Sequence, residues 1–211
     1  KGFVRKEVLS FSSTEPDVYL RIRHRRIAEN IVKLYYPSED NIFAAYKELI
    51  NKLEVNSVSS TLITDILKAT RQRNELSQTK IDKLFDIAAS KFDIDSHFVL
   101  HYSMNLERRG TRKDLEKGIE EIILVTSELD DLRNDRLIHR RAVLNAELGK
   151  LIYKQSTEAH QSIRYFNQAR EFFQRKRILD PQSHYSYENY LKFEIWFLEN
   201  IVHSEDEELK I

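Results

Sequence analysis

The stretch VYLRIRHRRIAENIVKLYY, residues 18–36, changes its hydrophobic period halfway along. Apolar residues stand at every second position from Val18 to Ile22, which is typical of a half-buried strand. From Ile27 to Tyr35 they fall at i, i+4, i+7 and i+8, which predicts one stripe of an amphipathic helix. The stretch therefore predicts a strand that leads directly into a helix, with the basic segment RHRR, residues 23–26, at the junction.

The neighbouring segments extend this pattern in both directions. Residues 2–11 are rich in strand-forming residues and residues 12–17 have turn chemistry, so we expect a β-hairpin ahead of the helix. Pro37 ends the helix, and Ser38 is expected to cap the next one. Beyond this point the sequence predicts only helices, over about 39–53, 58–71, 77–92, 96–109, 111–126, 135–154, 157–178 and 183–203.

Composition agrees with a mostly helical protein. The chain has 211 residues, of which 41% are apolar, but only four glycines and three prolines, which leaves little material for tight turns or phosphate-binding loops. It has no cysteine, which excludes disulfides and thiolate metal sites. The 34 basic and 34 acidic residues cancel, so no overall field attracts nucleic acid or anionic lipid. No apolar run is long enough for a membrane span, and we expect a cytoplasmic protein.

Two helices in the C-terminal half carry a spaced set of apolar and small residues. The set comprises Leu148, Gly149, Ile152 and Tyr153 on the first helix, and Phe166, Ala169 and the segment LDP, residues 179–181, on the second. This order resembles the tetratricopeptide repeat, although the proline comes about two turns late. The preceding pair offers a weaker match, because Gly118 replaces the consensus alanine and no proline follows. The resemblance covers about 94–203.

We therefore expect a mainly α fold, an α-solenoid of antiparallel helix pairs similar to tetratricopeptide repeats, with a short N-terminal β-hairpin. Three parts are expected: a hairpin and helix over 1–36, helical repeats without a signature over 37–93, and degenerate tetratricopeptide-like repeats over 94–211.

The junction RHRR followed by Ile-Ala has a second resemblance. A strand that ends in a histidine and runs into such a helix resembles the end of the winged-helix domain in STAND-type signal-transducing NTPases. His24 matches the histidine of that family. Arg25 stands where plant members carry an acidic residue, whereas many bacterial members look like this sequence. Residues 1–36 would then be the end of a winged helix.

This resemblance implies a role. In the family, the histidine reaches the β-phosphate of bound ADP, and ligand-sensing repeats follow the winged helix. His24 would then sense the nucleotide state of an NTPase domain upstream in the same polypeptide. No Gly-x-x-x-x-Gly-Lys-Ser/Thr loop occurs in the chain, so we expect it to bind no nucleotide by itself. It would be the ligand-sensing region of a signal-transducing NTPase, of the kind used in defence.

The last helix suggests where a ligand binds. We expect one apolar stripe to pack on the preceding helix: Tyr187, Leu191, Ile195, Leu198 and Val202. Three other residues would then face a groove, together with two from the previous repeat. The groove residues are Tyr185, Glu188, Lys192, Lys150 and Tyr153. Aromatic anchors with charged neighbours suit a protein or peptide ligand, although a role in covering the end of the array fits equally.

Other candidate sites receive less support. His97 and His101 have the spacing of two metal ligands on a helix but lack an evident third, so we expect a packed face and no metal. The basic segments 108–113 and 133–141 read as solvated helix faces. Alternatives are a nucleic-acid-binding helical module, which the alternating RIRHRR segment does not favour, and a scaffold unrelated to NTPases. The sequence contains no recognisable catalytic motif, so we expect no enzyme and no cofactor.

Overall fold

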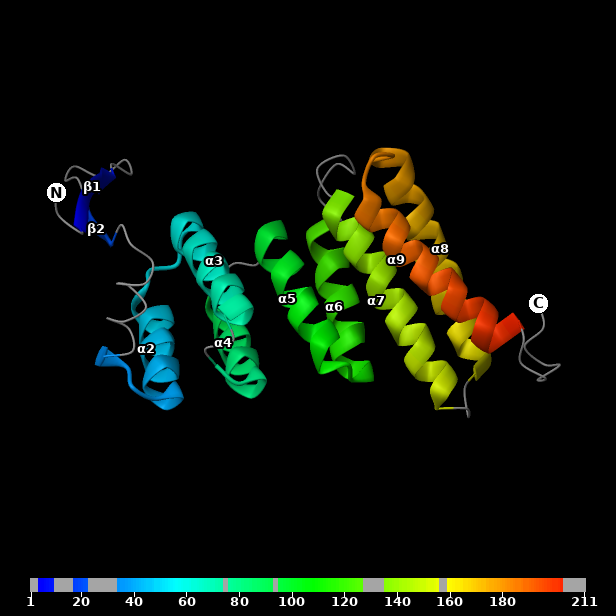
Figure 1. Ribbon diagram of the computed structural model, residues 1–211, viewed down its shortest axis with the longest axis horizontal. Coiled ribbons are helices and arrows are strands. Elements are labelled where there is room, and N and C mark those ends of the chain that lie inside the picture. Colours follow the sequence, from blue (N-terminus) through cyan, green and yellow to red (C-terminus); the bar gives the residue numbers. More distant parts are fainter. Residues whose placement is uncertain are drawn as a thin grey trace.

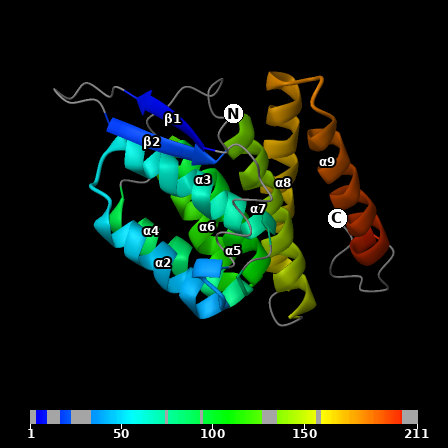
Figure 2. The ribbon, with the colours of Figure 1, turned by 60° about the vertical axis from the view of Figure 1, so that its left-hand side comes forward.

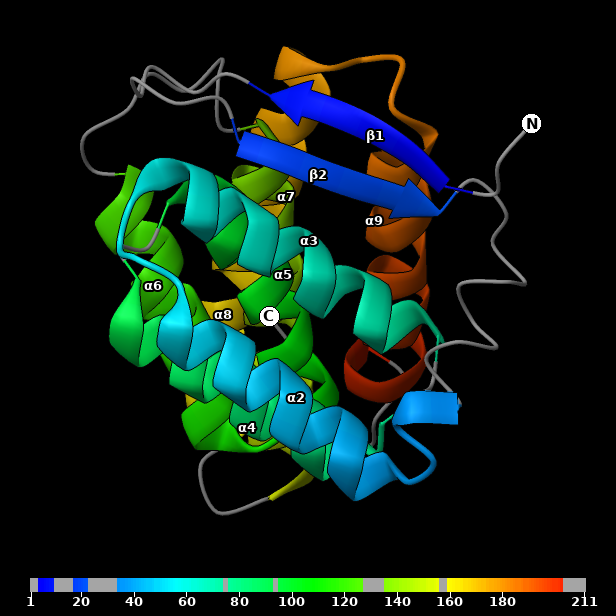
Figure 3. The ribbon, with the colours of Figure 1, turned by 90° about the vertical axis from the view of Figure 1, so that its left-hand side faces the viewer.

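The computed structural model describes residues 4–9, 17–22, 34–73, 76–92, 95–126, 135–155 and 159–202, and these are mainly helical. Strands β1 (Val4–Leu9) and β2 (Asp17–Ile22) pair antiparallel, with Val4 opposite Ile22. The two strands lie at the end of the molecule that carries α3 (Figure 3). The RHRR junction and its histidine, His24, lie outside the described residues.

Eight α-helices follow along the described chain. They are α2 (Glu39–Lys52), α3 (Ser57–Arg73), α4 (Gln78–Lys91), α5 (Ser96–Arg109), α6 (Arg112–Thr126), α7 (Asp135–Lys154), α8 (Ala159–Leu179) and α9 (His184–Phe197). A π-helical turn, η2 (Leu198–Val202), continues α9. The eight predicted helices are confirmed, with ends within a few residues of those expected from the apolar periodicity.

Local capping signals set several of these ends. The side chains of Ser38, Asp95 and Thr111 accept bonds from the backbone amides three residues on, at 3.2, 2.7 and 3.1 Å. Such bonds satisfy amides that have no partner inside the helix. Gly110 ends α5 in the left-handed conformation, with φ of 67°, as the sequence predicts.

The helices follow one another along the long axis of the molecule (Figure 1). Among them, α3, α5, α7 and α9 contact each other in succession. Helices α4, α6 and α8 each pack between two members of that row, and α2 lies against α4. We call α3, α5, α7 and α9 the odd helices. We call the surface formed by their exposed and half-exposed side chains the odd face; it runs from Asp65 on α3 to Lys192 on α9.

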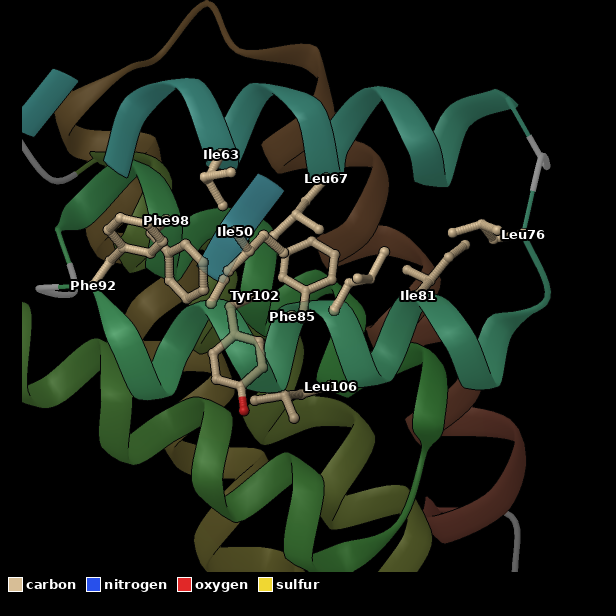
Figure 4. Packing of buried hydrophobic residues seen from close by; sticks show 12 residues of the cluster. Ile50, Ile63, Leu67, Leu76, Ile81, Phe85, Phe92, Phe98, Tyr102 and Leu106 are labelled. Carbon is tan, nitrogen blue, oxygen red and sulfur yellow. The ribbon is translucent and has the colours of Figure 1, made fainter. Parts of the chain in front are cut away.

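The core is a series of clusters along the same axis. The first joins α2, α3, α4 and α5, and its rings of Phe85, Phe98 and Tyr102 pack within 6.1 Å of one another (Figure 4). The second joins α5, α6 and α7, and the third joins α7, α8, α9 and η2. Each cluster is completed by the next helices, so neighbouring helices depend on one another for burial.

The α7–α8 contact is the closest to the tetratricopeptide pattern. Leu148, Gly149 and Ile152 of α7 are buried, as are Phe166 and Ala169 of α8. The ring of Phe166 lies so close to Gly149 that the position has no room for a side chain. Gly149 and Phe166, two of the residues that carry the resemblance, are thus in direct contact, whereas Leu148 and Ile152 belong to the cluster shared with α5 and α6.

The expected packing of α9 is wrong. The predicted apolar stripe is exposed, with 39% to 56% of each residue accessible: Tyr187, Leu191, Ile195, Leu198 and Val202. The helix instead buries Phe193, Phe197 and, one turn on, Ile201. The ring of Phe166 on α8 lies 5.8 and 5.4 Å from the first two rings. Aromatic rings bury more apolar area than aliphatic side chains do, so they decide which face of α9 packs on α8, the helix that lies beside it in Figure 2.

Candidate functional site

The five residues predicted for a ligand groove come from two adjacent odd helices, α7 and α9. Three of them, on α9, are exposed. Tyr185 has 65% of its surface accessible, and Glu188 forms an ion pair with Lys192 at 2.6 Å. These side chains follow one another at i, i+3 and i+7, so they share one side of the helix and are free to meet a ligand.

The other two residues fasten α9 to α7. The hydroxyl of Tyr153 donates to the carbonyl of Asn200 at 2.6 Å, and its ring meets the Trp196 ring edge-on at 5.9 Å. Lys150 bonds Glu147 within α7 at 2.8 Å, and its ammonium lies 5.5 Å from the centre of the Trp196 ring on α9. Asn200 stands fifteen residues beyond Tyr185, or about 22 Å along a helix, so Tyr153 and Tyr185 lie at opposite ends of α9.

A histidine of α7, His139, contacts α9 near the start of that helix. His139 accepts a bond from the side-chain amide of Asn189 at 3.0 Å, and its ring lies 5.7 Å from that of Phe173 on α8. Burial, with the nearby charges of Arg140 and Lys176, lowers the pKa of His139 to about 4. The imidazole is therefore neutral near pH 7, which its role as an acceptor requires.

The α5–α7 contact contains a buried ion pair. Arg140 donates to Glu107 at 2.6 Å and to the carbonyl of Ser103 at 3.3 Å, and only 8% of its side chain is accessible. The expectation that 133–141 forms a solvated face is therefore wrong at this position. The arginine is buried because α5 supplies both a carboxylate and a carbonyl to its guanidinium.

The α3–α5 contact contains an arginine without a carboxylate. Arg71 donates to the carbonyl of His101 at 3.4 Å and to the thioether of Met104 at 3.6 Å. Within the described ranges it forms no ion pair. Burial and the charges of Arg108 and Arg140 lower the pKa of its guanidinium.

The histidine pair lies on the same face. The rings of His97 and His101 meet edge-on at 5.1 Å, and Nε2 of His97 lies 3.4 Å from Asp65. Burial, followed by the charge of Arg71, lowers the pKa of His101 to about 4. In the part of the chain that the structure describes, no three acidic or histidine side chains converge as metal ligands.

A pocket of about 420 Å³ opens between α4, α5 and α6. Beside it, the hydroxyl of Tyr102 donates to Asp86 at 2.8 Å and accepts from Lys117 at 2.7 Å. Burial and the bond to Asp86 raise the pKa of Tyr102. Arg109 forms ion pairs with Asp86 and, at 3.5 Å, with Asp114. Arg109 also pairs with Asp82 at 3.3 Å, and we interpret this network as the link between the three helices.

The chain matches no protein-family model, no curated protein and no solved structure. The site therefore rests on the arrangement of its own residues. None of the helices in the described ranges combines the length and apolarity that a membrane crossing needs.

Sequence reasoning missed the cations at the α3–α5–α7 contacts. Arg108 and Arg140 have no acidic residue three or four positions away on their own helices. A solvated helix face usually pairs its charges at these spacings. This absence is a signal that the two arginines serve another helix or a ligand, and the sequence contains it.

Proposed function

We propose that this chain is a protein-interaction module, an α-solenoid of tetratricopeptide-like helix pairs, that binds a protein or peptide on its odd face. The observation that carries the proposal is the continuous row of odd helices. Polar contacts cross each junction of the row, from Arg71 on α3 to Asn189 on α9. Such a row is rigid, extended and lined with charged and aromatic side chains, which suits the recognition of an extended segment.

The close contact of Gly149 with Phe166 supports the tetratricopeptide-like assignment. In that repeat, small residues let the two helices of a pair approach, and here they stand at the positions named from the sequence. The exposed residues Tyr185, Glu188 and Lys192 on α9 are the proposed ligand contacts. Lys150 and Tyr153 would hold α9 in place beside them through Trp196 and Asn200.

We further propose that the module senses a ligand for a STAND-type NTPase domain in the same polypeptide. This proposal rests on His24 and its flanking residues. Ligand binding on the odd face would strain the array against the winged helix and draw His24 away from the ADP phosphate. Loss of one charge-assisted hydrogen bond, about 1.5 to 3 kcal/mol, shifts a two-state balance by about one to two orders of magnitude. Catalysis would belong to the NTPase domain.

Selection from a random peptide library on the purified chain tests the binding role. We expect enriched peptides whose affinity falls at least tenfold when Tyr185 and Lys192 are both replaced by Ala, since hot-spot contacts contribute about 2 kcal/mol or more. Arg164→Ala, an exposed change on α8, is the matched control and should leave affinity unchanged. Peptides that bind both variants equally would place the ligand elsewhere.

The nucleotide role has a separate test. In a polypeptide that joins a P-loop domain to this chain, His24→Ala should increase the rate of ADP release without ligand. Unchanged ADP retention would remove the proposed latch and leave the interaction module standing by itself.

A further inference from the structure

We propose that Lys68, Arg71 and Arg108 form a carboxylate-binding site for an acidic segment of the partner, at the α3–α5 contact. The inference rests on the proposed function, because it names the chemistry of the ligand on the odd face. The structure places these three cations on two adjacent helices, next to the buried pair of Arg140 and Glu107.

The site has more cations than carboxylates. Within the described residues Lys68, Arg71 and Arg108 form no ion pair. Two carboxylates act at this contact, Glu107 on Arg71 and Asp65 on His101, and both already face other partners. Glu107 bonds Arg140 at 2.6 Å, and Asp65 faces His97 at 3.4 Å.

Arg71 is the centre of the site because no carboxylate among the described residues pairs with its half-buried charge. In the described ranges its side chain donates to a carbonyl at 3.4 Å and a thioether at 3.6 Å, which are long or weak acceptors. Taking a charge out of water without a counter-charge destabilises the folded chain. A carboxylate that accepts two parallel bonds from the guanidinium would supply that counter-charge.

Two nine-tenths buried side chains line the site and have nitrogens without a hydrogen-bond partner. His101 is 6% exposed and its Nδ1 has none, and Arg140 is 7% exposed and its Nε has none. The backbone carbonyl of His101 already accepts from Arg71. The buried polar contacts at the α3–α5 and α5–α7 junctions are therefore incompletely satisfied.

The surroundings favour a peptide over a nucleic acid. Leu100 and Met104 on α5 are half-exposed next to these cations, so a ligand would meet apolar and charged side chains side by side. A nucleic acid needs a longer cationic track, and this chain carries equal numbers of basic and acidic residues overall. An acidic segment with apolar residues between its carboxylates matches both features.

The test uses a fluorescein-labelled octapeptide of glutamate and leucine, with anisotropy as the readout. We expect saturable binding that weakens about tenfold or more in Arg71→Gln and in Arg108→Gln, because each change removes a charge-assisted bond. The octapeptide with glutamine for glutamate should bind as weakly to the wild type. Arg164→Gln on α8 is the matched control and should bind like the wild type.

Stability separates a ligand contact from a structural role. Arg71→Gln should unfold at the same or a higher denaturant concentration than the wild type, since it removes an uncompensated charge. Arg108 is exposed, so Arg108→Gln tests binding without a change in folding. Octapeptide binding that both variants retain would overturn this site, while the library selection would still decide the proposed function. An oligonucleotide of equal charge that binds more tightly, and loses affinity in both variants, would overturn the choice of an acidic peptide.

Discussion

Gly149 on α7 and Phe166 on α8 touch without an intervening side chain. A Cβ atom added to Gly149 would lie 2.6 Å from Cε1 and 2.7 Å from Cδ1 of the ring. The ring cannot easily withdraw, because it lies between Phe193, Trp196 and Phe197 with centroid distances of 5.4 to 5.8 Å. This contact thus connects the α7–α8 pair to α9.

We expect Gly149→Ala to lower the free energy of unfolding by about 1 to 2 kcal/mol. Overpacking lowers stability by about 1 to 3 kcal/mol, and the higher helix propensity of alanine offsets part of that loss. Gly118→Ala is the matched control, since its Cβ would meet the flexible end of Leu144 at 3.0 Å. It should change stability much less. Urea unfolding measures both, and an unchanged or stabilised Gly149→Ala would show that α7 and α8 have room to separate.

Tyr153→Phe tests how α9 is fastened. The hydroxyl donates to the carbonyl of Asn200, and its loss should lower the free energy of unfolding by about 1 kcal/mol. Hydrogen exchange should accelerate most at the end of α9 and in η2, because the ring and its packing on Trp196 remain. Exchange that accelerates uniformly along the chain would contradict a local role.

The ion pair between α5 and α7 gives a third prediction. Glu107→Gln leaves the buried guanidinium of Arg140 without its counter-charge, so we expect a loss of about 2 kcal/mol in unfolding free energy. Glu188→Gln breaks the exposed pair with Lys192 and should change stability little. Equal effects of the two changes in urea unfolding would mean that burial does not distinguish the pairs.

Stability should also depend on pH. Burial lowers the pKa of both His101 and His139 to about 4 in the folded chain, against about 6.5 in an unfolded one. Between these values the unfolded chain binds more protons, so the contribution of both histidines is present above pH 6.5 and falls as the pH drops toward 4. Urea unfolding from pH 7 to 5 should show this decline, and His139→Gln should reduce its slope. A slope that His139→Gln leaves unchanged would mean that this imidazole titrates alike in both states.

Much of the fold could be predicted because local signals agree with it. The apolar period placed all eight described helices, and Gly110 and Thr111 marked the boundary between α5 and α6. The pattern failed on α9, where apolar residues occur on several sides and periodicity cannot rank them. The buried face of α9 is set by its neighbour α8, because the rings of Phe166 and Phe173 pack against Phe193.

The candidate site was harder to predict, because its contacts join separate helices. Tyr185, Glu188 and Lys192 were predicted to face a ligand groove; the structure shows that they are exposed, and the groove stays a prediction. Arg71 looks like an ordinary surface cation in the sequence, and Arg140 differs from one only in having no acidic residue three or four positions away. Their burial arises only when α3, α5 and α7 come together, which a single-helix pattern does not contain.

A map of backbone amide shifts in the ¹⁵N-labelled chain shows directly whether ligands bind the odd face. The probe is the glutamate and leucine octapeptide. We expect saturable shift changes concentrated on α3, α5 and α7 around Arg71 and Arg108, with α4, α6 and α8 largely unchanged. Shift changes centred on α4, α6 and α8, or no shift changes at saturating peptide, would contradict binding on the odd face.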